Sequence, residues 1–242
     1  MRHDMQQLLF WIQLRASSCI HIHCKFRSTS FFHNVFPFSV AFGDSKTDPG
    51  NKQAYLPYES RSERLPYGST FFGHPSDRFC DGRLTIDFQA QAYGLTLLSP
   101  YARGLGSDFQ HGANLAVSGS GCIPGVAGSA FHLTRQLNQF KKFRTSYEDK
   151  FVRDKSYISP NEYFGIGLYV ISTGENDYRN AILNMGLTSK EIKSEMAPKV
   201  VCLFPLVLTE ETEKGRKSSF FLSFRVQTSR DNREGSSGEL WV

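Results

Sequence analysis

The chain has 242 residues, of which 40% are hydrophobic, 21% charged and 14% aromatic, with 20 Gly and 10 Pro. This composition is that of a globular protein with a packed core, and it excludes collagen-like, coiled-coil and fully disordered classes. Lys and Arg outnumber Asp and Glu by 28 to 23, but the charges are scattered, so no nucleic-acid partner is predicted. No apolar run reaches the roughly 18 residues that a membrane-spanning helix requires, so no transmembrane segment is predicted.

The first 34 residues carry only a weak secretory pattern. Arg2 precedes a short apolar run over residues 8–14, which Gln13 interrupts before the small residues Ala16-Ser17-Ser18. A signal peptide has a basic start, an apolar stretch of about 7–15 residues and small residues at the cleavage site. We therefore predict a weak leader or a disordered segment over residues 1–34.

The five cysteines give no clear framework. Cys19 and Cys24 flank two histidines, but no second closely spaced cysteine pair follows, so no metal site is predicted there. Disulfide pairing cannot be deduced from these spacings and stays open.

Residues 35–201 show the alternation of an α/β domain. Strands are expected over residues 36–42, 113–117 and 168–171, and helices over residues 84–93 and 129–143, with a capping box at Thr188 and Glu191 before a further short helix. Strands that alternate with helices indicate a mainly parallel sheet covered on both faces. In such sheets the active site lies at the carboxyl ends of the strands.

The remaining residues, 202–242, have a different character. After a short apolar run they are rich in Glu, Lys, Arg and Ser, with Phe220-Phe221-Leu222 as one apolar group. We predict an irregular tail that does not complete the domain.

Three polar positions follow the predicted strands. Ser45 lies on a turn directly after the first strand, where a serine hydroxyl can act as a nucleophile if a base lies within hydrogen-bond reach. The tripeptide Gly43-Asp44-Ser45 alone also fits an ordinary turn. Gly119 offers an unobstructed N–H and Asn176 an amide, and with the N–H of Ser45 these are the parts of an oxyanion hole.

Several longer motifs accompany these positions. They are Leu-Pro-Tyr-Gly-Ser-Thr-Phe-Phe-Gly at 65–73, Arg-Phe-Cys-Asp-Gly-Arg-Leu-Thr-Ile-Asp-Phe at 78–88, Phe-Gln-His-Gly-Ala-Asn at 109–114 and Gly-Glu-Asn-Asp at 174–177. With Gly43-Asp44-Ser45, they make the chain resemble the plant GDSL esterase/lipase family of the SGNH hydrolase superfamily, in particular its early-nodulin and fucosidase-like branch.

The resemblance implies a flavodoxin-like three-layer αβα sandwich, truncated at its C-terminal end. It also implies Ser45 as the nucleophile, with Ser45, Gly119 and Asn176 forming the oxyanion hole. The expected reaction is hydrolysis of a small-molecule carboxylic ester, an acyl or acetylated compound, through an acyl-enzyme without metal or organic cofactor. Members of the family are usually secreted, so an extracellular location is expected by resemblance.

The sequence departs from the family pattern in two ways. Lys46, Pro49, Asp77 and Cys80 stand where the family usually has Leu, Thr, Gly and Ser. More seriously, the family's late Asp-x-x-His motif is absent, because no histidine follows position 132 and the only aspartate after position 177 is at 231. Neither a general base nor an orienting acid is found.

Two further histidines lie inside family motifs, His74 and His111. Those motifs do not normally supply the base, so neither is expected to replace it.

Three hypotheses follow. The chain is an ester hydrolase whose turnover is impaired, or a non-catalytic remnant that binds an ester or a carbohydrate in a retained oxyanion pocket. Alternatively, the loss of pattern near Val201 reflects a C-terminally incomplete product. The oligomeric state is not predicted.

Overall fold

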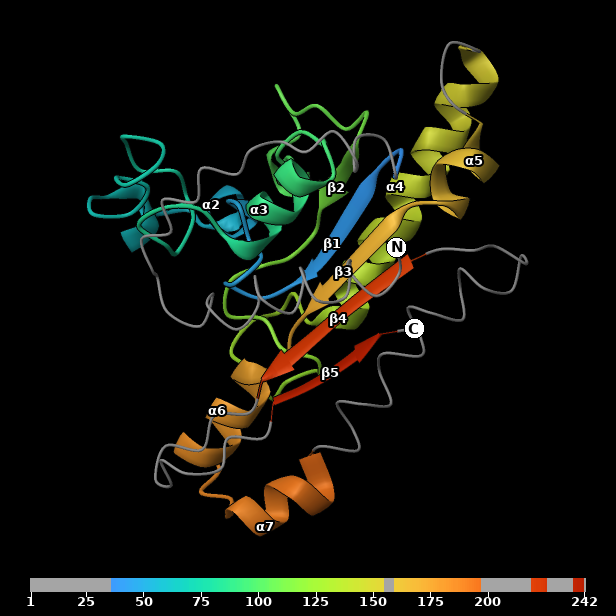
Figure 1. The fold of residues 1–242 in the computed structure, drawn as a ribbon. Helices are drawn as coiled ribbons and strands as arrows, with labels where there is room; N and C mark the ends of the chain where they lie inside the picture. The colour runs from blue at the N-terminus through green and yellow to red at the C-terminus, as the bar shows by residue number, and fades with distance from the viewer. Residues whose placement is uncertain (1–35, 155–158, 197–218, 226–236, 242) are drawn as a thin grey trace.

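The computed structural model describes residues 36–154, 159–196, 219–225 and 237–241. Within these ranges, five strands form one sheet in the order β2-β1-β3-β4-β5 (Figure 1). Their bounds are Ser39–Gly43 for β1, Gly112–Asn114 for β2, Leu168–Ser172 for β3, Ser219–Arg225 for β4 and Ser237–Trp241 for β5. The strands β1 to β4 run parallel to one another, and β5 runs antiparallel to β4.

The connecting segments hold mostly short helices. The α-helices are α2 (Asn51–Tyr55), α3 (Thr85–Ala92), α4 (Leu133–Arg153), α5 (Pro160–Gly165), α6 (Glu175–Leu183) and α7 (Ser189–Glu191), the last continuing into a π-helical turn, Ile192–Met196. Two 3₁₀ turns cover Arg61–Glu63 and Tyr101–Arg103. Among these helices, none is long and apolar enough to cross a bilayer.

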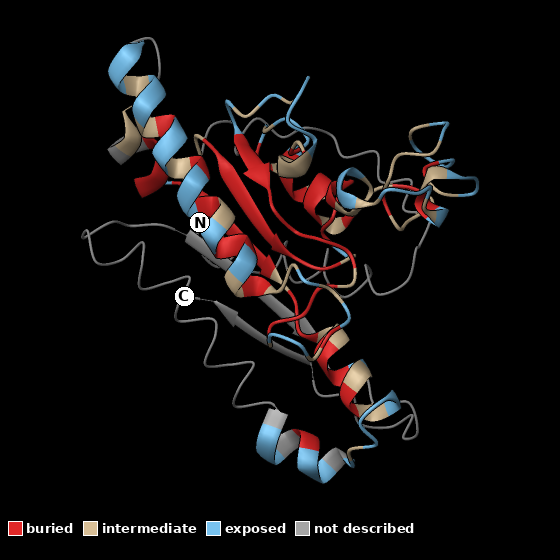
Figure 2. Cartoon of the chain, turned by 180° about the vertical axis from the view of Figure 1, so that it is seen from behind, coloured by how far each residue is buried: buried red, intermediate tan, exposed pale blue. Residues whose placement is uncertain are grey.

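The sheet has an apolar core on each face. Along β1, Val40 and Phe42 face the cluster that includes α4, whereas Ala41 faces the cluster that includes α3. This alternation follows from the two-residue period of a strand. The two views place α3 and α4 on opposite faces of the sheet (Figures 1 and 2). The predicted α/β sandwich is confirmed, and the order 2-1-3-4-5 is that of flavodoxin-like sheets.

The larger of the two clusters is dominated by aromatic rings. Phe38 stacks on Tyr163 with ring centroids 4.2 Å apart, and Tyr163 stacks on Tyr147 at 4.1 Å. Such contacts add about 0.5–1.5 kcal/mol each beyond the burial of their area. Aromatic contacts of this kind hold α4 and α5 against β1 and the residue before it.

The predicted helices and strands of residues 36–201 are present with shifted ends. The helix predicted over residues 129–143 begins at Leu133 and continues to Arg153, since its buried positions continue at helical spacing to Tyr147. The capping box is confirmed. The N–H of Thr188 donates to the Glu191 carboxylate at 2.7 Å, and the N–H of Glu191 donates to Thr188 Oγ1 at 3.3 Å.

The segment predicted to be an irregular tail contains two strands of the sheet. β4 pairs with the full length of β3, from Leu168 opposite Ser219 to Ser172 opposite Ser223. Its apolar group 220–222 was visible in the sequence, but the partner lies about 50 residues away along the chain. Unpaired N–H and C=O groups along the edge of β3 give such a segment a partner that no local pattern reveals. The other residues of 202–242, and the predicted leader over 1–34, lie outside the described ranges.

Candidate active site

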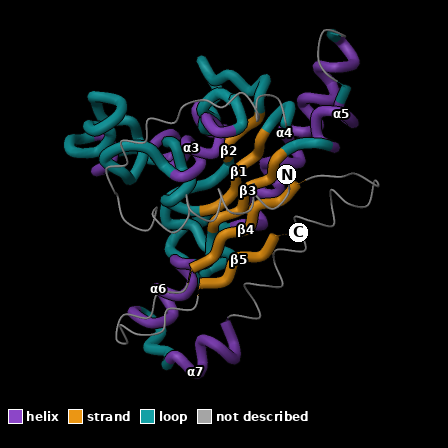
Figure 3. The backbone as a smooth tube through the Cα atoms, in the orientation of Figure 1, coloured by secondary structure: helices purple, strands orange, loops and turns teal. Residues whose placement is uncertain are grey.

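Three loops meet at the carboxyl edge of the sheet. The N–H of Asp44 donates to Ser172 O at 3.1 Å, so the turn after β1 lies beside the end of β3. The N–H of Val117 donates to Gly43 O at 3.0 Å, so the chain after β2 lies on its other side. The loops after β1, β2 and β3 leave the strands at this one edge (Figure 3). It is the edge at which parallel α/β sheets bind ligands.

The turn after β1 is held by one buried carboxylate. Asp48 is fully buried and accepts the backbone N–H groups of Gly50 (2.8 Å), Asn51 (2.6 Å), Lys52 (3.1 Å) and Ser118 (2.7 Å). Three of these donors belong to the start of α2, where N–H groups have no partner within the helix. The fourth ties the loop after β2 to the same turn.

Two asparagines add a second connection between these loops. The Asn51 amide donates to Asn114 O at 2.8 Å and to Ala116 O at 2.9 Å, and the Asn114 amide donates to Thr47 O at 2.7 Å. Both side chains are buried. Asn114 ends the motif at 109–114, but the positioning role of both asparagines emerges only from the folded structure.

A buried glutamine of α4 also holds the end of β1 in place. Gln136 Oε1 accepts the N–H of Gly43 at 2.8 Å, and its Nε2 lies 2.9 Å from Gly43 O and 3.1 Å from Ser120 Oγ. The end of β1 is thereby fixed to α4 and to the loop that carries Gly119.

This framework leaves two particular backbone N–H groups unused. In the turn after β1, the N–H groups of Asp44, Lys46, Thr47 and Asp48 all have acceptors. The N–H of Ser45 has no acceptor in the described part of the chain, and the Ser45 hydroxyl forms no hydrogen bond there.

The loop after β2 repeats this arrangement. The N–H of Ser118 donates to Asp48 and that of Ser120 to Val117 O, whereas that of Gly119 between them has no acceptor among the described residues. Gly119 has a φ of +85°, a left-handed conformation that disfavours residues with a Cβ.

Asn176 comes from the first turn of α6. Its Nδ2 donates to Ser120 O at 2.7 Å, which uses one of the two amide hydrogens and orients the group toward the loop of Gly119. The sequence predicted no helix here, and α6 begins one residue before Asn176, after Gly174 at φ +105°.

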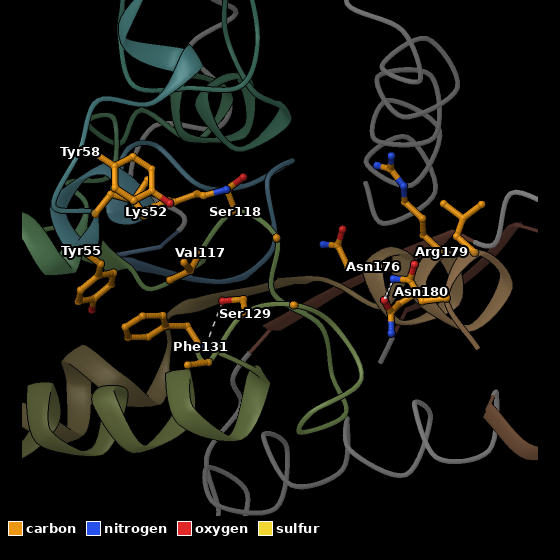
Figure 4. A pocket seen from close by; sticks show the side chains of 16 residues that line it. Lys52, Tyr55, Tyr58, Val117, Ser118, Ser129, Phe131, Asn176, Arg179 and Asn180 are labelled. Carbon is orange, nitrogen blue, oxygen red and sulfur yellow. Dashed lines mark hydrogen bonds between the residues drawn. The ribbon is translucent and has the colours of Figure 1, made fainter. Parts of the chain in front are cut away.

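Gly119 and Asn176 line one pocket of about 670 Å³ (Figure 4). Its described walls come from α2 and the chain that follows, the loop of Gly119, residues 128–131 and α6. Tyr55 and Phe131 stack face to face in it, with ring centroids 4.0 Å apart.

Four pocket residues, Lys52, Tyr55, Phe131 and Arg179, were not among the sequence candidates. Lys52 and Tyr55 share α2, but Phe131 and Arg179 lie on separate segments far along the chain, and no local motif connects the four.

The structure shows the surroundings of two residues that depart from the family motifs, Lys46 and Asp77. Lys46 pairs with Glu175 at the start of α6, an exposed contact that links the turn of Ser45 to the helix of Asn176. Asp77 has a φ of +63°, which explains why glycine is the usual residue in the motif that it departs from.

Burial changes the acidity of two aspartates beside the site. Burial raises the pKa of Asp44 from 3.8 to about 7, against the opposing hydrogen bond from the Lys46 N–H. Burial also raises the pKa of Asp177, against hydrogen bonds from the N–H groups of Ile123 and Cys122 and the nearby charge of His132. A Cβ at Gly121 would approach an Asp177 oxygen to 2.4 Å, so only glycine allows this close approach.

None of the three described histidines forms a hydrogen bond to Ser45. His74 is exposed and its Nδ1 lies 2.8 Å from Pro75 O. The carbonyl of His111 accepts the N–H of Ser39, at the opposite end of β1 from Ser45. His132 precedes α4, and its buried Nδ1 has no hydrogen-bond partner.

Among the described residues, no group of three His, Cys, Asp or Glu side chains is placed to hold a metal ion. The Cys19 and Cys24 segment lies outside the described ranges, as does Cys202, whereas Cys122 is a buried free thiol.

Comparison with known proteins gives consistent matches. The GDSL-like lipase/acylhydrolase family matches residues 40–199. A protein named "Esterase" from Hevea brasiliensis is 40% identical over 172 residues, which cover 66% of this chain and 42% of the relative. The "GDSL esterase/lipase ENOD8" of Medicago truncatula is 38% identical over 153 residues, covering 59% and 38% of the two chains.

A third relative carries a different name. "Alpha-L-fucosidase 3" of Arabidopsis thaliana is 33% identical over 178 residues, covering 70% of this chain and 46% of the relative. The match spans less than half the length of each of these three proteins. The family match alone spans well over half of the 242 residues, and the chain therefore belongs to the GDSL-like lipase/acylhydrolase family, with plant GDSL esterase/lipases among its relatives.

Proposed function

We propose that the chain acts on carboxylic esters of small molecules through an acyl-enzyme on Ser45. The observation that carries the proposal is the pair of unused N–H groups at Ser45 and Gly119, each between neighbours that are hydrogen-bonded. Asn176 lines the same pocket as Gly119 and keeps a second amide hydrogen. These are three donors of the kind that stabilise a developing oxyanion.

In the proposed reaction the Ser45 oxygen attacks the ester carbonyl and its proton passes to a base. The carbonyl oxygen becomes an oxyanion that accepts hydrogen bonds from the N–H groups of Ser45 and Gly119 and from the Asn176 amide. When this intermediate collapses, the base returns the proton to the leaving oxygen, the alcohol departs and an acyl group remains on Ser45. Water then attacks the acyl group, releasing the carboxylic acid and restoring the serine. The proposal invokes no metal or organic cofactor.

The proton acceptor is the weak element of this scheme. No Asp-x-x-His motif follows Asp177: the run from Asp108 to His111 lies at the opposite end of β1 from Ser45, and no described histidine forms a hydrogen bond to Ser45. Loss of a triad member in a serine hydrolase lowers turnover on the order of 10⁶-fold and leaves about 10³–10⁴-fold over water. We therefore propose slow turnover for this polypeptide, with non-catalytic ester or carbohydrate binding as the alternative.

The test is hydrolysis of p-nitrophenyl acetate by the purified chain, by Ser45→Ala and by Ser129→Ala. Ser129 lines the pocket but has no proposed catalytic role, so its variant controls for loss of a serine hydroxyl. Hydrolysis that Ser45→Ala abolishes and Ser129→Ala retains would support the proposal. Equal rates for the unchanged chain and Ser45→Ala would reject it in favour of the binding alternative.

Added imidazole tests whether the missing base limits the rate. Free imidazole hydrolyses the same ester, so the rate with Ser45→Ala is subtracted at each concentration. A Ser45-dependent increase with imidazole concentration is expected, because a base then becomes available to the hydroxyl. No increase would mean that proton removal does not limit the reaction.

By resemblance to the family, we also propose that the protein is secreted. Expression of the chain with its own N-terminus in plant cells, followed by detection in the medium, tests this. Retention of all the protein inside the cells would contradict it.

A further inference from the structure

Among the described residues, the charged side chains that line the pocket beside the proposed oxyanion hole are all positive. The described pocket lining includes two cationic side chains, Lys52 and Arg179, and no carboxylate. The other described lining residues are aromatic, aliphatic or neutral polar.

Both cations lie close to a proposed oxyanion donor. Lys52 Nζ is 4.0 Å from the position that a Cβ on Gly119 would occupy. Arg179 follows Asn176 by three residues on α6, which puts the two side chains on neighbouring positions of the helix surface. Asn176 lies between Lys52 and Arg179 in the close view (Figure 4).

Neither charge is neutralised by an ion pair within the described residues. Lys52 Nζ lies 5.2 Å from the centroid of the Phe79 ring, a contact that orients an ammonium group without cancelling its charge. The nearby Asp48 carboxylate is occupied by four backbone N–H groups, including that of Lys52 itself at 3.1 Å.

We propose that this pocket selects esters that carry a carboxylate within reach of the scissile carbonyl, on either the acyl or the alcohol part. The inference rests on the proposed function, because it assumes that the ester carbonyl lies at Gly119 and Asn176. Lys52 or Arg179 binds the substrate carboxylate, depending on which side of the carbonyl carries it, and the stacked Tyr55 and Phe131 contact the uncharged part of the substrate. Lys52 and Arg179 are therefore specificity-determining residues.

A simpler role for the two cations is to stabilise the oxyanion itself. That role would help neutral and anionic esters equally, whereas the proposed role favours the anionic ester of a matched pair. Binding to Ser45→Ala separates the two, because an unreacted ester carries no oxyanion.

The experiment measures affinity of the full-length Ser45→Ala chain by ligand-observed NMR. One pair of ligands differs in the acyl part, monomethyl glutarate against methyl valerate. The other pair differs in the alcohol part, 4-acetoxybutanoate against butyl acetate. Partly exposed charge pairs contribute only modestly to affinity, so we expect roughly fivefold tighter binding of the anionic ester in at least one pair.

The variant with Lys52→Gln and Arg179→Gln is expected to lose this preference. Lys142→Gln with Arg153→Gln, two exposed cations of α4, removes the same charge and is expected to keep it. The preference should also weaken as NaCl is raised.

Equal affinities within both pairs, or a preference that survives loss of Lys52 and Arg179, would overturn the inference. Because binding is measured without turnover, this failure is distinct from inactivity toward p-nitrophenyl acetate, which bears on the proposed function alone.

Discussion

The turn that carries Ser45 and the wall of the pocket lined by Gly119 and Asn176 are built in opposite ways. Residues 44–52 are held by buried groups, with Asp48 accepting four N–H groups and Asn51 bridging to the chain after β2. The pocket wall, apart from the buried Val117 and Ser118, consists of partly or fully exposed residues on separate elements, such as Tyr55, Phe131 and Arg179.

In the proposed function, this difference separates the reacting groups from the groups that select the substrate. Buried hydrogen bonds fix the backbone donors near Ser45, because each unsatisfied buried group would cost free energy. Exposed side chains have few such constraints, so they can change with little effect on folding. The turn therefore suits a reaction shared by the family, and the pocket wall suits a choice of substrate particular to this chain.

The largest expected effect comes from removing the centre of the turn. Asp48→Ala leaves four backbone N–H groups without their acceptor, and at about 1–3 kcal/mol for a buried unsatisfied group we expect a loss of roughly 5 kcal/mol in unfolding free energy. Urea unfolding followed by circular dichroism measures this. Asp48→Asn keeps the shape and part of the accepting capacity, so it should lose less, and a loss below about 1 kcal/mol for Asp48→Ala would contradict the assigned role.

Gln136 tests the support that α4 gives to the same turn. Gln136→Leu removes the acceptor of the Gly43 N–H, and we expect a loss of about 3 kcal/mol in the same unfolding experiment. The matched control is Gln139→Leu on the same helix, whose amide donates a hydrogen bond to the exposed Tyr55 hydroxyl and to no other described residue. Similar losses for the two variants would show that the contact of Gln136 with β1 has no special importance.

Asp44 makes the stability of the folded chain depend on pH. Its pKa is about 7 in the folded chain against 3.8 ordinarily, so between these values the folded state keeps a proton that the unfolded state releases. Stability is therefore lost as pH rises through this window, by about 2 kcal/mol between pH 5 and 7.

Asp44→Asn, which cannot ionise, is expected to lack this part of the pH dependence. Unfolding midpoints in urea at the two pH values measure the effect for both chains. Lys46, Glu175 and Asp177 are the charged groups that act on Asp44, and they remain in the variant. The same pH slope in both chains would contradict the raised pKa.

The smallest effect on stability is expected at the pocket wall. Phe131→Ala removes one ring of the Tyr55–Phe131 stack, which is partly exposed, so the unfolding free energy should change by less than about 1 kcal/mol. Affinity for methyl valerate should fall nonetheless, because the uncharged part of the ester contacts these rings in the proposed complex. A large loss of stability with unchanged affinity would reverse the contrast between turn and wall.

Much of this molecule could be predicted from local patterns. The strands after which Ser45, Gly119 and Asn176 stand are where their apolar residues predicted them, and the helices α3 and α4 follow their buried spacing. The ladder between β3 and β4 could not be predicted, because it joins segments about 50 residues apart.

The sequence by itself determined the α/β class, the positions of the polar residues after the strands and the family to which they belong. Periodicity and motif spacing are local properties, and local chain sterics and amphipathicity suffice to specify them. Only the tertiary structure decided which N–H groups stay unpaired and which cations line the pocket. Asp48 meets Ser118 and Lys52 approaches Gly119 only because parallel strands bring their carboxyl ends to one edge, and that convergence depends on non-local pairing.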